Sequence, residues 1–184
     1  MRYIALLRGI NVGTSGRIRM DALKRLLEEA GLSNVSTYIQ SGNVLFDATL
    51  SEAEAREAIE RALKDGAGIA TVAVVRTASE FQAIISRNPF SAEEIAAAQA
   101  ENAEGESFHA CLLPAKPSAL DIEKLNAIAP SSDKYSVDDR TLYLLLRQSI
   151  RVSKLAQRVQ KIFPNMTVRN WNIMRTLSEL SNKS

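Results

Sequence analysis

The sequence contains few of the residues that disulfides, metal sites and many catalytic centres require. It has one cysteine, Cys111, and one histidine, His109. A single cysteine excludes an intramolecular disulfide, and two such residues are too few for a His- or Cys-rich metal site. Cys111 stands in the apolar run FHACLLP, where we expect a buried structural thiol in a reducing compartment. The sequence therefore predicts no metal and no cofactor.

Signals for catalysis are equally sparse. His109 is the only histidine available to a Ser-His-Asp arrangement, no GxSxG elbow accompanies it, and its place in a predicted strand favours a structural role. Carboxylates are plentiful, but no pair stands out as a catalytic dyad. Asp138 and Asp139 fall in a predicted turn, where aspartate is common.

Long hydrophobic runs and a strong net charge are also missing. No apolar stretch approaches the roughly 20 residues that span a bilayer, and no signal-peptide pattern opens the chain. The net charge is +2, which does not by itself call for a nucleic-acid partner. Hydrophobic residues make up 46% of the chain, enough for a sizeable core. We expect a soluble cytoplasmic protein with no membrane partner.

Hydrophobic periodicity predicts the same order of elements in both halves of the chain. In the first half, segments in which apolar and polar residues alternate, as in strands, take turns with segments in which apolar residues have helical spacing. The predicted elements are a strand at 3–8, a helix at 20–30, strands at 35–40 and 43–48, a helix at 51–64 and a strand at 70–76. Ser41 and Gly42 are interpreted as a two-residue hairpin turn, Ser51 and Glu54 as a capping box, and Gly66 to Gly68 as a helix breaker. A short helix follows and stops at Pro89.

The second half repeats this order after an Ala/Glu-rich segment. Strands are predicted at 107–114, at 134–139 and 141–148, and near 165–170, with helices at 118–129, 153–163 and 171–180. The order βαββαβ is the ferredoxin-like motif, so we expect an α+β fold of two ferredoxin-like βαββαβ subdomains in tandem. The sheets would be mainly antiparallel, with helices packed on one face. The predicted domains are 1–90 and 107–184, joined by a helical connector at 91–106.

This topology brings two polar loops together. The right-handed crossover makes the first two strands parallel, so both end at the same edge of the sheet. The loop RGINVGTSGRIRM should then lie beside QSGN. The candidate ligand-binding residues at this edge are Arg8, Asn11, Arg17, Gln40, Ser41 and Asn43.

Two interpretations of this edge stay open. Arginine matches phosphate or carboxylate groups, glycine-rich turns expose N–H groups, and a helix N-terminus favours anions. The loop fits neither GxGxxG nor GxxxxGK[ST], and Asp21 would oppose a bound anion. A purely structural turn is therefore the alternative.

Two further polar features carry candidate residues. In TVRNWN, Asn170 is a suitable N-cap for the last helix, and Arg169 and Trp171 are either a stacking platform for a ligand or a core anchor. Between Arg147 and Lys161, basic residues gather on one helical face, which is either a solvated surface or a contact for nucleic acid or protein. The RNP1 aromatic pattern is missing, so nucleic acid is the weaker alternative to a small anion.

The segments YIALLRGINVG, YIQSGN and RNWN together resemble family 1697 of bacterial domains of unknown function. The resemblance implies an α+β fold with ferredoxin-like subdomains and no particular activity. Two departures stand out: Thr14 and Ser15 replace the family's usual glycine and lysine, and Ile173 replaces a threonine after RNWN. Our main hypothesis is a binding module, or an enzyme, for a small phosphorylated or carboxylated ligand at the Arg8 and Gln40 edge.

Overall fold

The structure is a computed structural model that describes residues 1–14, 16–129 and 131–183. Ser15, one of the positions at which the chain departs from the family pattern, lies outside the described residues. Contacts group the chain into two compact units, Met1–Ala83 with Thr176–Ser184, and Ile84–Arg175. The predicted boundaries of 1–90, 91–106 and 107–184 stay a prediction, because grouping by contact does not test which segments fold alone.

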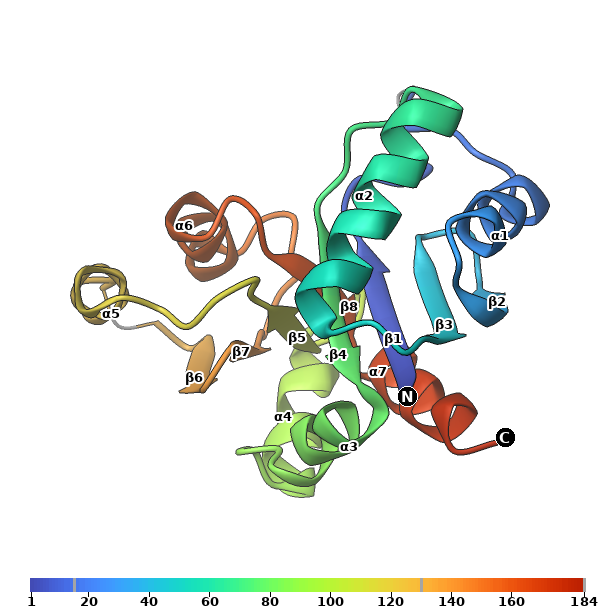
Figure 1. The fold of residues 1–184 in the computed structure, drawn as a ribbon. Helices are drawn as coiled ribbons and strands as arrows, with labels where there is room; N and C mark the ends of the chain where they lie inside the picture. The colour runs from blue at the N-terminus through green and yellow to red at the C-terminus, as the bar shows by residue number, and fades with distance from the viewer. Residues whose placement is uncertain (15, 130, 184) are drawn as a thin grey trace. The chain divides into compact units, whose positions relative to one another are not determined.

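The first repeat has the predicted order of elements. It consists of β1 (Arg2–Leu7), α1 (Met20–Glu29), β2 (Ser33–Tyr38), β3 (Asn43–Asp47), α2 (Glu52–Ala67) and β4 (Ala73–Thr77). The strands form an antiparallel sheet in the order β2-β3-β1-β4 (Figure 1). This is the ferredoxin-like order, in which the first strand lies between the third and the fourth.

The second repeat has the same topology. Two helices, α3 (Ala78–Ser86) and α4 (Ala92–Glu101), precede it. It consists of β5 (Phe108–Leu112), α5 (Ala119–Asn126), β6 (Lys134–Asp138), β7 (Thr141–Leu145), α6 (Lys154–Ile162), β8 (Thr167–Asn170) and the following α7 (Trp171–Ser181). Its sheet order is β6-β7-β5-β8, and every pairing is antiparallel. The predicted tandem α+β fold is therefore confirmed.

Alternating strand residues face the helices in the first unit. Tyr3, Ala5 and Leu7 of β1 pack in one buried cluster with Leu23 of α1 and Ile59 of α2. Figure 1 shows α2 lying over β1 and β4. The intervening residues of the same strands are buried as well, so the central strand β1 is apolar on both faces.

The second unit has a comparable cluster under α5 and α6. Cys111 of β5 and Leu144 of β7 pack there with Leu125 of α5 and Val159 of α6. Cys111 is fully buried, as predicted, and burial raises the pKa of its thiol to about 12. None of the helices in the described part of the chain is long and apolar enough to cross a membrane.

Two local predictions in the first repeat are wrong. The turn between β2 and β3 has four residues, 39–42, because Tyr38 already pairs with Asn43. Ile39 and Gly42 both have positive φ, and residues 39–42 form a turn that continues neither strand. A two-residue turn is instead found in the second repeat, where Asp138 pairs with Thr141.

The other correction concerns the end of α2. The helix runs through Gly66 to Ala67, and Gly68 ends it with a φ of 66°. Glycine suits position 66 inside the helix because Leu26 of α1 packs against its backbone. A Cβ at this position would lie 2.4 Å from Leu26 Cδ2. The predicted capping box of Ser51 and Glu54 is present.

His109 makes the stability of the fold depend on pH. Its side chain is 7% exposed, and burial lowers its pKa to about 4. The unfolded chain therefore binds a proton that the folded chain excludes, and the free energy of unfolding falls as the pH drops from about 6.5 towards 4. Between about pH 7.5 and about pH 5, wild type should lose about 2 kcal/mol more than His109→Leu. Urea unfolding at both pH values measures this, and equal losses would contradict it.

Candidate functional site

Three segments enclose the end of β1. The N–H of Leu7 donates to the carbonyl of Gly42, at 2.8 Å, and the N–H of Arg8 donates to the carbonyl of Val72, at 3.0 Å. The carbonyl of Arg8 also accepts a 2.8 Å hydrogen bond from the hydroxyl of Thr71. The loop after β1 is therefore held between the turn before β3 and the segment before β4.

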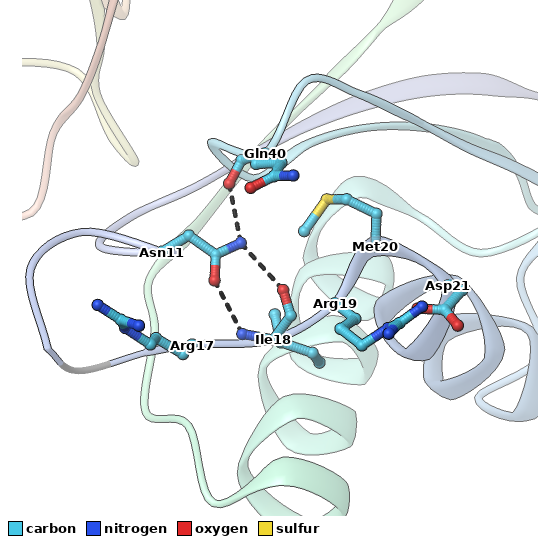
Figure 2. Close-up of a pocket in the computed structure, with 7 residues that line it drawn as sticks. All are labelled: Asn11, Arg17, Ile18, Arg19, Met20, Asp21 and Gln40. Atoms are coloured by element: carbon cyan, nitrogen blue, oxygen red, sulfur yellow. Dashed lines mark hydrogen bonds and ion pairs between the residues drawn. The ribbon is translucent and has the colours of Figure 1, made fainter.

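The side chain of Asn11 joins the two loops that the sequence places together. Its Nδ2 donates to the carbonyls of Ile18, at 3.0 Å, and Gln40, at 2.9 Å, and its Oδ1 accepts from the N–H of Ile18, at 2.9 Å (Figure 2). The predicted meeting of the loops is thus confirmed. These bonds use both ends of the amide, so Asn11 acts in this structure as a clamp between backbone segments.

Ser41 and Asn43 close the turn on the other side of the contact. Asn43 is fully buried, and its Nδ2 donates to the carbonyl of Tyr38, at 3.0 Å, and to Ser41 Oγ, at 2.9 Å. A buried amide with such partners stabilises the turn because it satisfies polar groups that would otherwise be buried unpaired. These contacts give both Ser41 and Asn43 a structural role within the loop itself.

An open pocket of about 710 Å³ lies at the start of α1. Its lining residues come from the β1–α1 loop, the first turn of the helix and the β2–β3 turn, and they are Asn11, Arg17, Ile18, Arg19, Met20, Asp21 and Gln40 (Figure 2). The pocket therefore contains three of the six residues predicted for this edge, together with Arg19, which is not one of the six.

Two arginines supply the positive charge of this pocket. Arg17 is exposed, and its Nε and Nη2 donate to the carbonyl of Gly13, at 3.3 and 3.2 Å. Arg19 is also exposed, and its Nε lies 3.1 Å from Asp21 Oδ1. The hydrogen bond from Arg19 is the main reason that the pKa of Asp21 is lowered, so this carboxylate is charged at neutral pH.

The start of α1 differs from that of other helices in the chain. Serine side chains cap α2, α4, α5 and α6 by accepting a backbone N–H of the first turn. Arg19 stands at the N-cap of α1 and makes no such bond. Asp21 places a carboxylate in the first turn of this helix, where the backbone N–H groups of Asp21 and Ala22 contribute to the lowering of its pKa.

Arg8 lies at a different surface. It lines a second depression, formed with Gly9, Gly16, Gly68, Thr71 and Val72 among others, and not the pocket that contains Gln40. The antiparallel neighbour β4 begins beside Arg8, and the backbone N–H of Arg8 donates to the carbonyl of Val72, just before β4. The structure thus divides the predicted edge into one depression at Arg8 and one at Arg17, Arg19 and Gln40.

Arg169 and Trp171 belong to the second unit. The indole of Trp171 stacks on Phe108, with ring centroids 4.3 Å apart, and meets Tyr143 edge-on at 6.2 Å. Asn170 caps α7 as predicted, because its Oδ1 accepts the N–H of Ile173 at 2.9 Å. Phe108 thus occupies one face of the indole.

The two repeats place an arginine at the same position of their last strand. Arg169 pairs with Ala110 in the register of β5 and β8, and Arg76 pairs with Ile4 in the register of β1 and β4. In each case Nη1 donates to the carbonyl of the preceding residue at 2.8 Å. Burial lowers the pKa of Arg169 to about 10, which leaves the group charged at neutral pH.

Arg76 was not among the predicted site residues. It is 2% exposed, and its Nη1 lies 3.6 Å from Glu52 Oε1. The sequence signal that points to Arg76 is the alignment of VVRT in the first repeat with TVRN in the second. This alignment places Arg76 and Arg169 at equivalent positions. Within residues 1–14, 16–129 and 131–183, no group of three His, Cys, Asp or Glu residues is placed to hold a metal ion.

Gly16 and Gly13 provide a test of how tightly the β1–α1 loop is built. Both have a φ of 64°, but a Cβ on Gly16 would lie 2.4 Å from the carbonyl oxygen of Gly9, whereas one on Gly13 would meet nothing within 4 Å. Gly13→Ala should cost about 1 kcal/mol for its backbone conformation alone. Gly16→Ala should cost a further 1 kcal/mol or so, because the loop must move. Urea unfolding compares the two, and equal costs would contradict the close packing.

Comparisons with known proteins agree with this fold. The chain is similar over 98% of its length to the solved structure of the conserved bacterial protein SP0830 from Streptococcus pneumoniae, with a TM-score of 0.76, 19% sequence identity and 98% of that chain covered. No curated protein matches the chain. The family model described as a protein of unknown function, DUF1697, matches residues 1–143. This range includes both loops of the pocket, whereas residues 169–172 lie beyond it. The chain belongs to the DUF1697 family.

Proposed function

We propose that the protein binds a small anion, a phosphorylated or carboxylated ligand, in the pocket at the start of α1. The observation that carries this proposal is the lining of the pocket by two exposed guanidinium groups, Arg17 and Arg19, beside Gln40. Guanidinium groups bind phosphate and carboxylate through paired N–H donors. Gln40 adds a neutral side chain that donates and accepts hydrogen bonds.

The end of α1 supports the same ligand chemistry. The first N–H groups of a helix have no partner within the helix, and the helix dipole favours an anion there by roughly 0.3–1 kcal/mol at an exposed site. No side-chain cap from Arg19 occupies these groups. An anion in the pocket could therefore contact the arginines and the helix end together.

Asp21 is the group that a bound anion would have to compete with. Its carboxylate pairs with Arg19, and the backbone N–H of Ala22 contributes to the lowering of its pKa. In the absence of ligand, the carboxylate thus supplies negative charge where the proposal places a phosphate. Binding is expected to break the Arg19–Asp21 pair, which is exposed and costs little to separate.

Substitution of the arginines tests the proposal. Isothermal titration with inorganic phosphate, glucose 6-phosphate and adenosine monophosphate should reveal at least one ligand. Arg17→Ala and Arg19→Ala should each weaken its binding by about tenfold, as expected for the loss of a charge-assisted hydrogen bond. Arg25→Ala is the matched control, because Arg25 is exposed on the same helix and lines no part of this pocket. Absence of binding, or equal losses in all three variants, would contradict the proposal.

Asp21→Asn gives a result of opposite sign. Removal of the carboxylate frees Arg19 and removes a charge that repels the ligand, so affinity for the same anion should rise by about threefold to tenfold. The same titration measures the change. An unchanged or lower affinity would mean that the anion does not occupy the space beside Asp21.

A further inference from the structure

The two repeats differ in how their helices meet above the sheet. In the first repeat, α1 and α2 pack closely, with Leu26 of α1 directly against Gly66 of α2. The corresponding helices of the second repeat, α5 and α6, are shorter, with 8 and 9 residues against 10 and 16. The largest difference is between α6 and its counterpart α2, which is seven residues longer.

A groove of about 840 Å³ lies between α5 and α6. Its lining residues are Lys124, Ala127, Ile128, Ala129, Ser131, Lys154, Leu155, Arg158, Lys161 and Ile162. All of them belong to the second compact unit. The groove combines an apolar base, to which Ile128, Leu155 and Ile162 contribute, with a rim of long basic side chains.

The basic side chains of the rim form no ion pairs within the described part of the chain. Lys124, Lys154, Arg158 and Lys161 are exposed, and none of the four forms an ion pair with another described residue. The described lining also contains no aspartate or glutamate. By contrast, Lys116, Lys134 and Arg147 elsewhere in this unit are each paired with a carboxylate. The groove therefore presents a row of basic side chains around an apolar base, and Asp121, one turn from Lys124 on α5, is a carboxylate that interacts with this row.

We propose that this groove binds an acidic amphipathic helix of a partner protein. Such a helix would place its apolar side chains on the base and its carboxylates against the rim. Lys154, Arg158 and Lys161 follow each other at spacings of four and three residues along α6, over about 10 Å of helix. Carboxylates with the same spacing on a partner helix match this row.

The shape and lining favour a helix over other anionic partners. Phosphates of a nucleic acid would pair with the rim but leave the apolar base in contact with water. A lipid surface is bound by apolar side chains that protrude, whereas Ile128, Leu155 and Ile162 line a concave surface. Complementary charge and a buried apolar face are both satisfied by an acidic helix.

Selection of helical peptides against the full chain tests this proposal. A displayed library of helices with random surface residues should yield binders that are amphipathic and rich in Glu and Asp. Fluorescence anisotropy with the selected peptide should show binding that weakens by about tenfold in Lys154→Glu/Arg158→Glu, and with added salt. Ala127→Trp places a bulky side chain at an exposed position of the groove and should weaken binding similarly.

A charge-matched control distinguishes the groove from general electrostatic attraction. Arg61→Glu/Lys64→Glu makes the same charge change at exposed positions of α2, which is the equivalent of α6 in the first repeat. This variant should keep the wild-type affinity. The proposal is overturned if selection yields no acidic amphipathic helix, or if both double variants weaken binding equally. Groove-dependent binding of single-stranded DNA or of anionic phosphatidylserine vesicles, without any bound peptide, would also overturn it.

Discussion

The first strand of each repeat determines where its other elements lie. β1 lies between β3 and β4, and β5 lies between β7 and β8, with both neighbours antiparallel to it. The end of β1 must therefore meet the beginnings of both neighbours. Leu7 and Arg8 show this directly, because their backbone N–H groups donate to segments on opposite sides of the strand. The position of β1 between two antiparallel neighbours thus both buries the strand and brings three loops to one end of the sheet.

Much of this arrangement could be predicted from the sequence because it depends on connectivity and periodicity. Alternating and helical patterns indicate βαββαβ twice, and the right-handed crossover places residues 8–11 near residues 40–43. The contact between Asn11 and Gln40 confirms the second step. Neither step requires knowledge of side-chain packing.

The features that could not be predicted from the sequence depend on tertiary contacts. Gly66 is read as a helix breaker until Leu26 is found against it, and the turn at 39–42 is longer than expected because Tyr38 pairs with Asn43. The roles of polar side chains were equally hidden, since an asparagine that clamps backbone and one that binds a ligand look alike in a sequence. The part that Arg19 plays could not be predicted either, because its exposure and its place at an uncapped helix end are structural properties.

The unequal helix lengths of the two repeats provide a physical account of the two proposed surfaces. The first repeat has closely packed helices and places its polar groups in the loops at the end of the sheet. The second has shortened helices and exposes a charged groove on its helical layer. One topology therefore offers two kinds of surface, because loops and helix lengths differ while the strand order is the same in the two repeats.

The single thiol of the chain has a practical consequence for following its motions. Cys111 lies in the central strand of the second sheet and is shielded by α5 and α6, while the first sheet contains no cysteine. A thiol reagent can therefore modify the folded chain only when the second sheet opens. Its rate of reaction reports the opening of the second repeat alone, because the first repeat contains no cysteine.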